Sequence, residues 1–359
     1  MRTHLVVGIV GLARFAGADD TQLCKDKHDA KACYSAALEA DDHGDLALGA
    51  KFYAIACTGG VLEGCTNLGV DYLQGLGVVK DAARGIGLYK KACDAKHAAA
   101  CANLGTIYQA GTAVPQDLKR ATVLYDRACA GGNGLGCALL AQNTEDGVGG
   151  PADPAKATTL FAKACELGRP RSCNTAGNRY ASGIGSARDV DRAAKAYIAG
   201  CNRKDLDSCV NLGQAYINGS GVAPDPKKAN ELFKQVCDGD RGIGCVKLAN
   251  SYTGGRGVTI DLARAGKLHI RACDLGEPLG CTMSGEDYEF GTGVPKDATH
   301  AVLLYESACT KKEMIGCKNL GALYQRGGTG VPADPAKSRQ YLQKACDGKY
   351  EPACAALTK

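Results

Sequence analysis

The chain has 359 residues, 45% of them hydrophobic, and a formal net charge of +5. This apolar content is enough to bury a core, whereas the mild charge and the lack of a long Lys/Arg run argue against nucleic acid as a partner. The only long apolar run, residues 5–13, is too short to cross a bilayer, so we expect no transmembrane segment.

The N-terminal residues have the pattern of an export signal. A basic start precedes the apolar run, and Ala16-Gly17-Ala18 has the small-x-small form that signal peptidase cleaves. Arg14 departs from this pattern because it places a charge at the end of the apolar segment. We predict that residues 1–18 are a signal peptide and that the mature chain is exported, either to a periplasm or to the outside of the cell.

Twenty cysteines follow in ten pairs, whose members are eight residues apart, or nine in the first pair. Successive pairs between residues 57 and 317 are offset by 36 residues. A fixed period of this length is typical of stacked repeats, so we expect residues 19–359 to form one solenoid rather than several globular domains. In sequence order, the pairs are Cys24 and Cys33, Cys57 and Cys65, Cys93 and Cys101, Cys129 and Cys137, Cys165 and Cys173, Cys201 and Cys209, Cys237 and Cys245, Cys273 and Cys281, Cys309 and Cys317, and Cys346 and Cys354.

The first part of each repeat has the periodicity of a helix, which we call helix A. Leu68, Gly69 and Tyr72 stand three, four and seven residues after Cys65, and these spacings place them on one helical face. The same columns recur along the chain, with exceptions such as Thr144 in the Tyr column. The small column lets another helix approach closely, and a glycine such as Gly75 ends helix A.

A short loop then leads to a second helix, helix B. An Asp at the end of the loop can cap the first N–H groups of this helix. Helix B carries a small column and a mostly aromatic column, as at Ala121 and Tyr125, and it closes on Ala-Cys. The predicted helix pairs span residues 29–60, 61–96, 97–132, 133–168, 169–204, 205–240, 241–276, 277–312 and 313–349, followed by a C-terminal capping helix at 350–359.

Two cysteine pairings fit the period, with partners either eight or about 28 residues apart. The shorter pairing uses every cysteine, whereas the longer one leaves Cys24 and Cys354 without partners. We therefore predict ten disulfides, paired in sequence order, that join each helix B to the next helix A in an oxidising compartment. The alternatives are metal or redox sites, but the chain lacks Cys-x₂₋₄-Cys spacings and its six His residues share no register with the cysteines. We predict no metal site and no cofactor.

The motif Cys-x-Asn-Leu-Gly-x-x-Tyr, then Gly-x-Gly-Val, Asp and Ala-x-x-Leu-Tyr-x-x-Ala-Cys, resembles the Sel-one-like repeat (SLR), a relative of the tetratricopeptide repeat. The best matches are "CTNLGVDYLQGLGVVKD" from Cys65 and "CANLGTIYQAGTAVPQD" from Cys101. The paired cysteines resemble the Helicobacter cysteine-rich protein (Hcp) branch. The resemblance covers residues 24–359. It implies an all-α fold: a right-handed α/α superhelical solenoid of about nine 36-residue helix-turn-helix repeats, exported, with one disulfide per repeat.

The resemblance implies two functions, protein scaffolding and penicillin binding with β-lactamase activity. A serine β-lactamase needs Ser-x-x-Lys, and no Ser here has Lys three residues later, so we name no catalytic residue. We expect a non-enzymatic scaffold that binds a protein or peptide through a groove lined by helix A. The alternative is a penicillin-binding protein with weak β-lactamase activity, whose ligand is a β-lactam or a peptidoglycan fragment.

The groove is predicted from a polar row that lies five residues after the second Cys of each pair. Amides in such a row can hold the backbone of an extended peptide, while differing neighbours select its side chains. Glu286 of this row, with Glu145 and Glu289 eight residues after the second Cys, predicts an acidic stretch of the groove. The alternative is that the row is simply a solvated face. The predicted groove residues are Thr106, Gln142, Asn178, Gln214, Asn250 and Glu286.

Overall fold

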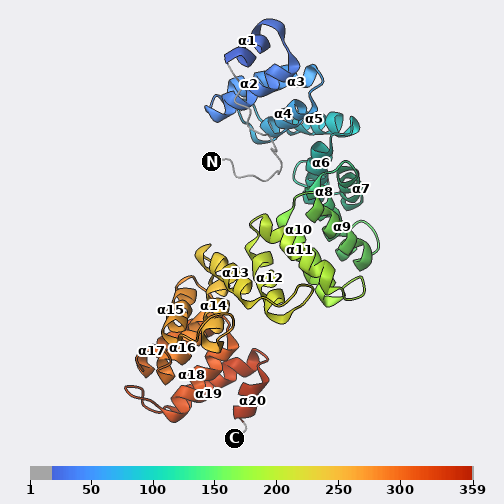
Figure 1. Ribbon diagram of the computed structural model, residues 1–359. Helices are drawn as coiled ribbons and strands as arrows, with labels where there is room; N and C mark the ends of the chain where they lie inside the picture. Colours follow the sequence, from blue (N-terminus) through green and yellow to red (C-terminus); the bar gives the residue numbers. More distant parts are fainter. Residues whose placement is uncertain (1–17, 358–359) are drawn as a thin grey trace. The chain divides into compact units, whose positions relative to one another are not determined.

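The computed structural model describes residues 18–357, so the predicted signal peptide lies outside the described residues except for Ala18. Within this range the chain contains helices and no β-strand, which confirms the predicted all-α repeat solenoid (Figure 1). None of the described helices has the length and hydropathy of a membrane span.

The helices follow one another with short connections. Their bounds are α1 (Ala18–Lys27), α2 (Ala30–Asp42), α3 (Leu46–Thr58), α4 (Leu62–Gln74), α5 (Ala82–Asp94), α6 (Ala98–Ala110), α7 (Leu118–Ala130), α8 (Gly134–Asp146), α9 (Pro154–Glu166), α10 (Pro170–Ser182), α11 (Val190–Asn202), α12 (Leu206–Asn218), α13 (Pro226–Asp238), α14 (Gly242–Gly254), α15 (Leu262–Asp274), α16 (Pro278–Phe290), α17 (Ala298–Thr310), α18 (Met314–Arg326), α19 (Pro335–Asp347) and α20 (Glu351–Leu357). Even-numbered helices occupy the position of helix A, and odd-numbered helices that of helix B.

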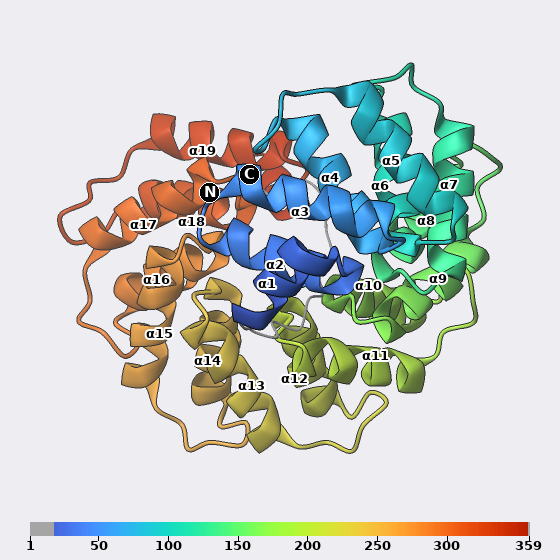
Figure 2. The same ribbon diagram turned by 90° about the horizontal axis from the view of Figure 1, so that it is seen from above.

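The chain divides into two compact units, one ending at Arg188 and the other beginning at Asp189. Within each unit, helices that are neighbours in sequence pack side by side (Figures 1 and 2). Helix A also contacts helix A of the next repeat, as between α6 and α8 in the first unit and between α14, α16 and α18 in the second. Side chains from successive A helices can therefore contribute to one continuous surface.

The small column of helix A and the aromatic column of helix B meet in the core. A Cβ added at Gly105 would lie 2.6 Å from the ring of Tyr125, and Gly285 has the same relation to Tyr305. Both tyrosines are almost fully buried. Because the rings leave no room for a methyl group, the two columns fix how closely the helices of one repeat approach.

The Asp at the end of each loop caps helix B as expected from the sequence. The carboxylate of Asp81 accepts the backbone N–H of Arg84 at 3.0 Å, and the N–H of Lys228 lowers the pKa of Asp225. At the other end of the loop, Gly75 ends α4 with a φ of 77°, which favours glycine. The same Asp cap recurs at Asp117, Asp153, Asp189, Asp225, Asp261, Asp297 and Asp334.

The loop between helix A and helix B also docks onto helix B of the preceding repeat. In the first unit, Thr158 of α9 donates its hydroxyl to the carbonyl of Ile184 at 2.9 Å. A Cβ at Gly185 would lie 2.2 Å from the carbonyl oxygen of Pro154, the first residue of α9. In the second unit, the Asn230 amide donates to the carbonyl of Arg256 at 2.7 Å. Each loop therefore adds a backbone contact between repeats.

Candidate partner-binding surface

Ten disulfides link helix B to the following helix A throughout the described chain. Their Cα–Cα distances are 4.4–4.7 Å, and no cysteine is free. The bonded cysteines are those eight residues apart, or nine for Cys24 and Cys33. Most of these cysteines are buried. Ten such bonds indicate that the chain folds in an oxidising environment.

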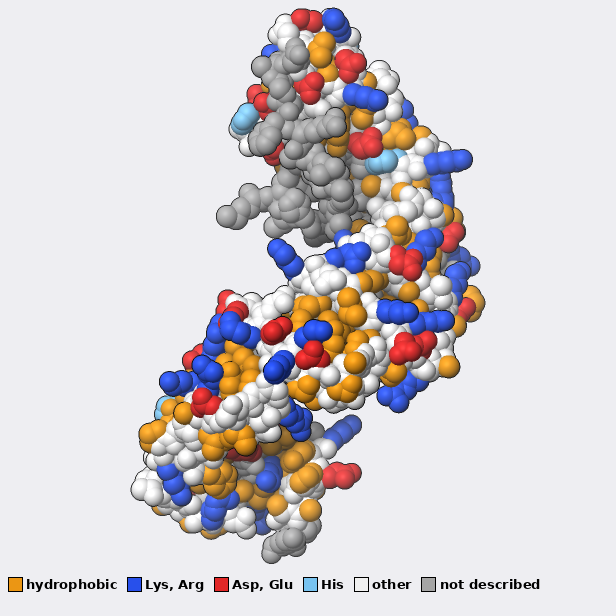
Figure 3. Space-filling view, viewed as in Figure 1, with side chains coloured by type: hydrophobic (Ala, Val, Ile, Leu, Met, Phe, Trp, Pro, Cys, Tyr) orange, Lys and Arg blue, Asp and Glu red, His pale blue; other side chains and the backbone are white. Residues whose placement is uncertain are grey.

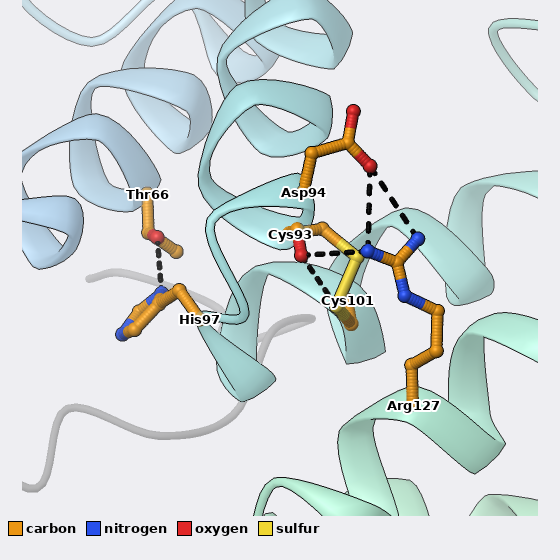
Figure 4. Close-up of a disulfide and its surroundings, with 6 residues drawn as sticks. All are labelled: Thr66, Cys93, Asp94, His97, Cys101 and Arg127. Carbon is orange, nitrogen blue, oxygen red and sulfur yellow. Dashed lines mark hydrogen bonds and ion pairs between the residues drawn. A yellow bond between two sulfur atoms is a disulfide. The ribbon is translucent and has the colours of Figure 1, made fainter.

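Figure 4 shows the surroundings of one of these bonds, between Cys93 and Cys101. Arg127 of α7 donates to the carbonyl oxygen of Cys93 at 2.8 Å and forms an ion pair with Asp94 at 3.3 Å. A cation is favourable here because the last carbonyls of α5 carry the negative end of the helix dipole. Arg271 makes the equivalent bond to Cys237 at 3.1 Å. The disulfide region is thus a structural joint between repeats.

His97 lies on the other side of the same joint (Figure 4). Its Nδ1 is 2.9 Å from the hydroxyl oxygen of Thr66, and burial lowers the pKa of the imidazole, with Glu63 opposing this effect. Within residues 18–357, no group of His, Cys, Asp or Glu side chains is arranged to hold a metal ion. His97 therefore has a structural role: it precedes the first turn of α6 and is hydrogen-bonded to Thr66.

In the first unit, the predicted groove residues lie on α6, α8 and α10. Gln142 and Asn178 are exposed, whereas Thr106 is half-buried and accepts the Tyr125 hydroxyl at 3.4 Å. Gln142 donates to Asp146, one turn further along α8, at 2.8 Å. Both amide side chains therefore lie on the surface, whereas Thr106 also bonds to a core side chain.

In the second unit, the row lies on α12, α14 and α16, and two of its residues are bonded to side chains of the next helix A. Lys247 donates to the side-chain oxygen of Gln214 at 3.2 Å, and Asn319 of α18 donates to Glu286 at 2.7 Å. Asn250, between them, is exposed. Lys247 and Asn319 lie outside the row, so these bonds extend it with polar side chains of the next helix A; we call this set of residues on the A helices of this unit the polar strip.

The structure corrects the prediction that part of the groove is acidic. Glu145 is paired with Arg179, and Glu289 is paired with Arg326. Glu289 is also buried and accepts the Tyr305 hydroxyl at 2.8 Å. The prediction of an acidic stretch is therefore wrong for Glu145 and Glu289, which arginines neutralise, whereas Glu286 accepts from the Asn319 amide. Each arginine stands about one repeat after its glutamate in the sequence. The repeat pattern alone did not predict that these two positions would meet.

Phe290 is a candidate contact residue that the sequence analysis missed. It ends α16, its side chain is 64% exposed, and the Arg326 guanidinium lies 5.9 Å from its ring centre. The equivalent positions in the other repeats carry polar, small or charged residues, such as Asn218. An exposed aromatic ring beside an arginine is the kind of side-chain pair that anchors partners at protein interfaces.

A column of cations was also missed, although the sequence contains it. The third residue after each capping Asp of helix B, from Asp81 onward, is basic: Arg84, Arg120, Lys156, Arg192, Lys228, Arg264, His300 and Lys337. Five of these cations lie over the ring of the Tyr in helix A of their own repeat, at 4.4–5.7 Å from its centre. Counting from the Asp rather than from the Cys would have revealed them.

Comparison with known proteins gives the family. The Sel1 repeat model matches seven stretches, residues 62–97, 98–133, 134–168, 206–240, 243–277, 278–312 and 315–350. No curated protein matches the chain.

Among solved structures, a protective antigen of uropathogenic Escherichia coli strains with an SLR fold is 24% identical, with a TM-score of 0.79 over 95% of this chain and 73% of that one. A Sel1 repeat protein from Oxalobacter formigenes is 25% identical, with a TM-score of 0.68 over 83% of this chain and 86% of that one. Helicobacter pylori cysteine rich protein B is 27% identical, with a TM-score of 0.31 over 36% of this chain and 93% of that one. The chain belongs to the Sel1 repeat family, as a cysteine-rich member with a disulfide at each joint between repeats.

Proposed function

We propose that the chain is an exported scaffold that binds an extended peptide segment of a partner protein along its A helices. The observation that carries the proposal is the polar strip of the second unit, where Gln214, Asn250 and Glu286 present differing side chains one repeat apart. Amides can donate to and accept from a peptide backbone, and their spacing by repeats suits an extended chain rather than a compact ligand.

The exposed ring of Phe290 gives this strip an apolar anchor. Burying a large aromatic side chain contributes about 2 kcal/mol, more than the amide hydrogen bonds are expected to add individually. Arg326, which pairs with Glu289, borders this ring and holds one side of the anchor in place. We therefore expect the strongest contact near the end of α16, with the amides of α12 and α14 fixing direction and register.

Disulfides at the joints support both export and binding. They indicate an oxidising compartment, and they hold successive A helices in place before a partner arrives. A surface that is already ordered loses less conformational entropy on binding than one that must fold around its partner. The β-lactam alternative has no comparable support, because the sequence lacks Ser-x-x-Lys.

The test is selection of peptides from a displayed random library on the oxidised chain, followed by affinity measurements on variants. Phe290→Ala together with Asn250→Ala should weaken the selected peptides at least about tenfold, the loss expected for one aromatic anchor. The matched control is Asn202→Ala with Gln340→Ala, two exposed residues on B helices of the same unit. Equal weakening by both pairs would contradict the proposed surface, and turnover of a chromogenic cephalosporin by the purified chain would favour the enzyme alternative.

A further inference from the structure

The cation column at the start of helix B opposes the usual chemistry of helix ends. The third helical position normally favours Glu or Gln, because the first turn carries the positive end of the helix dipole. A cation there is disfavoured, because it meets the same positive end of the dipole. Stacking on tyrosine offsets this in part, as for Arg264, whose guanidinium lies 5.1 Å from the ring centre of Tyr252 and donates to its hydroxyl at 3.0 Å.

Two consecutive repeats of the second unit concentrate these cations in one place, which we call the loop edge. It comprises the first turns of α13 and α15 and the loop 255–261 between α14 and α15. Lys227 and Lys228 stand on α13, Arg256 lies in the loop and Arg264 lies in the first turn of α15. Among the described residues, neither Lys227 nor Arg256 has an ion-pair partner. With the two capping aspartates, Asp225 and Asp261, four cations and two anions give the loop edge a net charge of +2.

The parts of the loop edge are held together by direct contacts. Asn230 of α13 binds the carbonyl of Arg256 at 2.7 Å. A Cβ at Gly257 would lie 2.6 Å from the carbonyl carbon of Pro226, so the loop backbone rests on the first turn of α13. The cations of the two repeats therefore occupy one contiguous surface.

A pocket with both apolar and polar walls lies within this basic surface. It has a volume of about 400 Å³ and is lined by Tyr252, Val258, Thr259, Ile260, Asp261 and Arg264. Ile260 is 61% exposed and Leu262, just beyond it, is 40% exposed. Neither side chain contributes to the core, and exposed aliphatic groups beside a pocket are typical of surfaces that contact another molecule.

We propose that the loop edge binds an acidic peptide segment of a protein partner, with one aliphatic or aromatic side chain of that segment in the pocket. The net positive charge favours carboxylates, which Lys227 and Arg256 are placed to pair with. The pocket between Tyr252 and Ile260 supplies the apolar contact that a purely ionic surface would lack. This surface is additional to the strip on the A helices, so it extends the proposed scaffold function.

Another repeat of the same chain provides an internal contrast. In the first unit, the equivalent loop at 147–153 has no cation, and Thr144 replaces the tyrosine of helix A. Counted over the first turns of both B helices and the loop, Lys119, Arg120 and Lys156 with Asp117 and Asp153 give a net charge of +1, against +2 at the loop edge. Because this repeat lacks the loop cation and the tyrosine, an acidic segment should bind there more weakly, although the fold of the two repeats is the same.

The test uses fluorescence anisotropy with a labelled, end-blocked peptide of Asp and Glu residues around a single Leu. Two companion probes replace the acids by their amides, or the Leu by Ser. Lys227→Gln with Arg256→Gln should weaken the acidic probe about fivefold, as expected for two partly exposed ion pairs. The matched control, Lys195→Gln with Lys267→Gln, removes the same charge from exposed helix B positions and should change binding less than about twofold.

Ile260→Ser tests the pocket and should weaken the Leu probe while leaving the Ser probe unchanged. Three results would overturn the proposal: absence of saturable binding, equal losses in the loop-edge and control variants, or equally good binding of polyphosphate or single-stranded DNA. Gln214→Ala with Asn250→Ala separates the two surfaces. If that pair weakens the acidic probe and the loop-edge pair does not, the loop-edge proposal fails while the A-helix proposal stands.

Discussion

Gly221 occupies a position where two separate constraints exclude a side chain. Its φ is +72°, and a Cβ would lie 2.0 Å from the carbonyl oxygen of Val190, at the start of α11. Gly276 meets only the first constraint, with a φ of +86° and a single atom, Lys311 Nζ, at 3.9 Å from its added Cβ. Comparing Ala at the two positions separates backbone strain from the contact between repeats.

Gly276→Ala should destabilise its surroundings by about 1–2 kcal/mol, the penalty of the left-handed conformation alone. Gly221→Ala carries the same penalty. In addition, its Cβ must move about 1 Å away from the Val190 carbonyl oxygen to reach 3.0 Å, below which Cβ contacts are essentially never found. Forcing an extra methyl group into a tight contact adds about 1–3 kcal/mol. We therefore expect Gly221→Ala to be the more destabilising by about 2 kcal/mol.

Native-state hydrogen exchange is the suitable assay, because repeat arrays need not unfold in one step. A difference of 2 kcal/mol corresponds to about thirtyfold faster exchange of the slow amides in α11 and in the loop after α12. Amides of α19 should be unaffected, since each repeat contacts only its neighbours. If the exchange rates increase equally in the two variants, docking of the loop does not contribute to stability and the reasoning is refuted.

Three further predictions follow from local chemistry. Lys96 has a φ of +66°, so Lys96→Gly should stabilise the turn between α5 and α6 by about 1 kcal/mol, measured as slower hydrogen exchange there; unchanged exchange would contradict the strain. Replacing Cys129 and Cys137 by Ala should destabilise α7 and α8 by about 2.5 kcal/mol, measured by proteolysis of those helices, with a loss spread over distant repeats as the contrary result. Burial, with help from the Glu306 carboxylate that accepts its hydroxyl at 2.8 Å, raises the pKa of Tyr341 to about 12. Stabilisation by the neutral phenol should be complete below about pH 10 and lost as the pH rises through about 12, a dependence that Tyr341→Phe should remove in alkaline unfolding curves.

Much of the fold could be predicted because each column of the repeat has one dominant physical cause. Gly105 is small since Tyr125 packs on it, and Asp117 caps the helix that carries that ring. Side-chain contacts between repeats were harder to predict. The sequence shows that Glu145 and Arg179 are 34 residues apart. It does not show how far one A helix is shifted along its axis relative to the next. That shift decides whether two charges meet, and it depends on packing that no single repeat reveals.

The short spacing of the disulfides bears on how the chain acquires them. When a second cysteine such as Cys65 appears during synthesis, its partner Cys57 is eight residues away, whereas the next cysteine, Cys93, is 28 residues further on. Closing the shorter loop is favoured by about 1 kcal/mol of chain entropy, and the competing thiol has not yet emerged. A chain oxidised progressively from its N-terminus would therefore meet the correct partner first at every step. In a fully unfolded chain, twenty thiols could pair in an enormous number of ways. Stepwise oxidation replaces these with ten successive pairings between close neighbours in sequence.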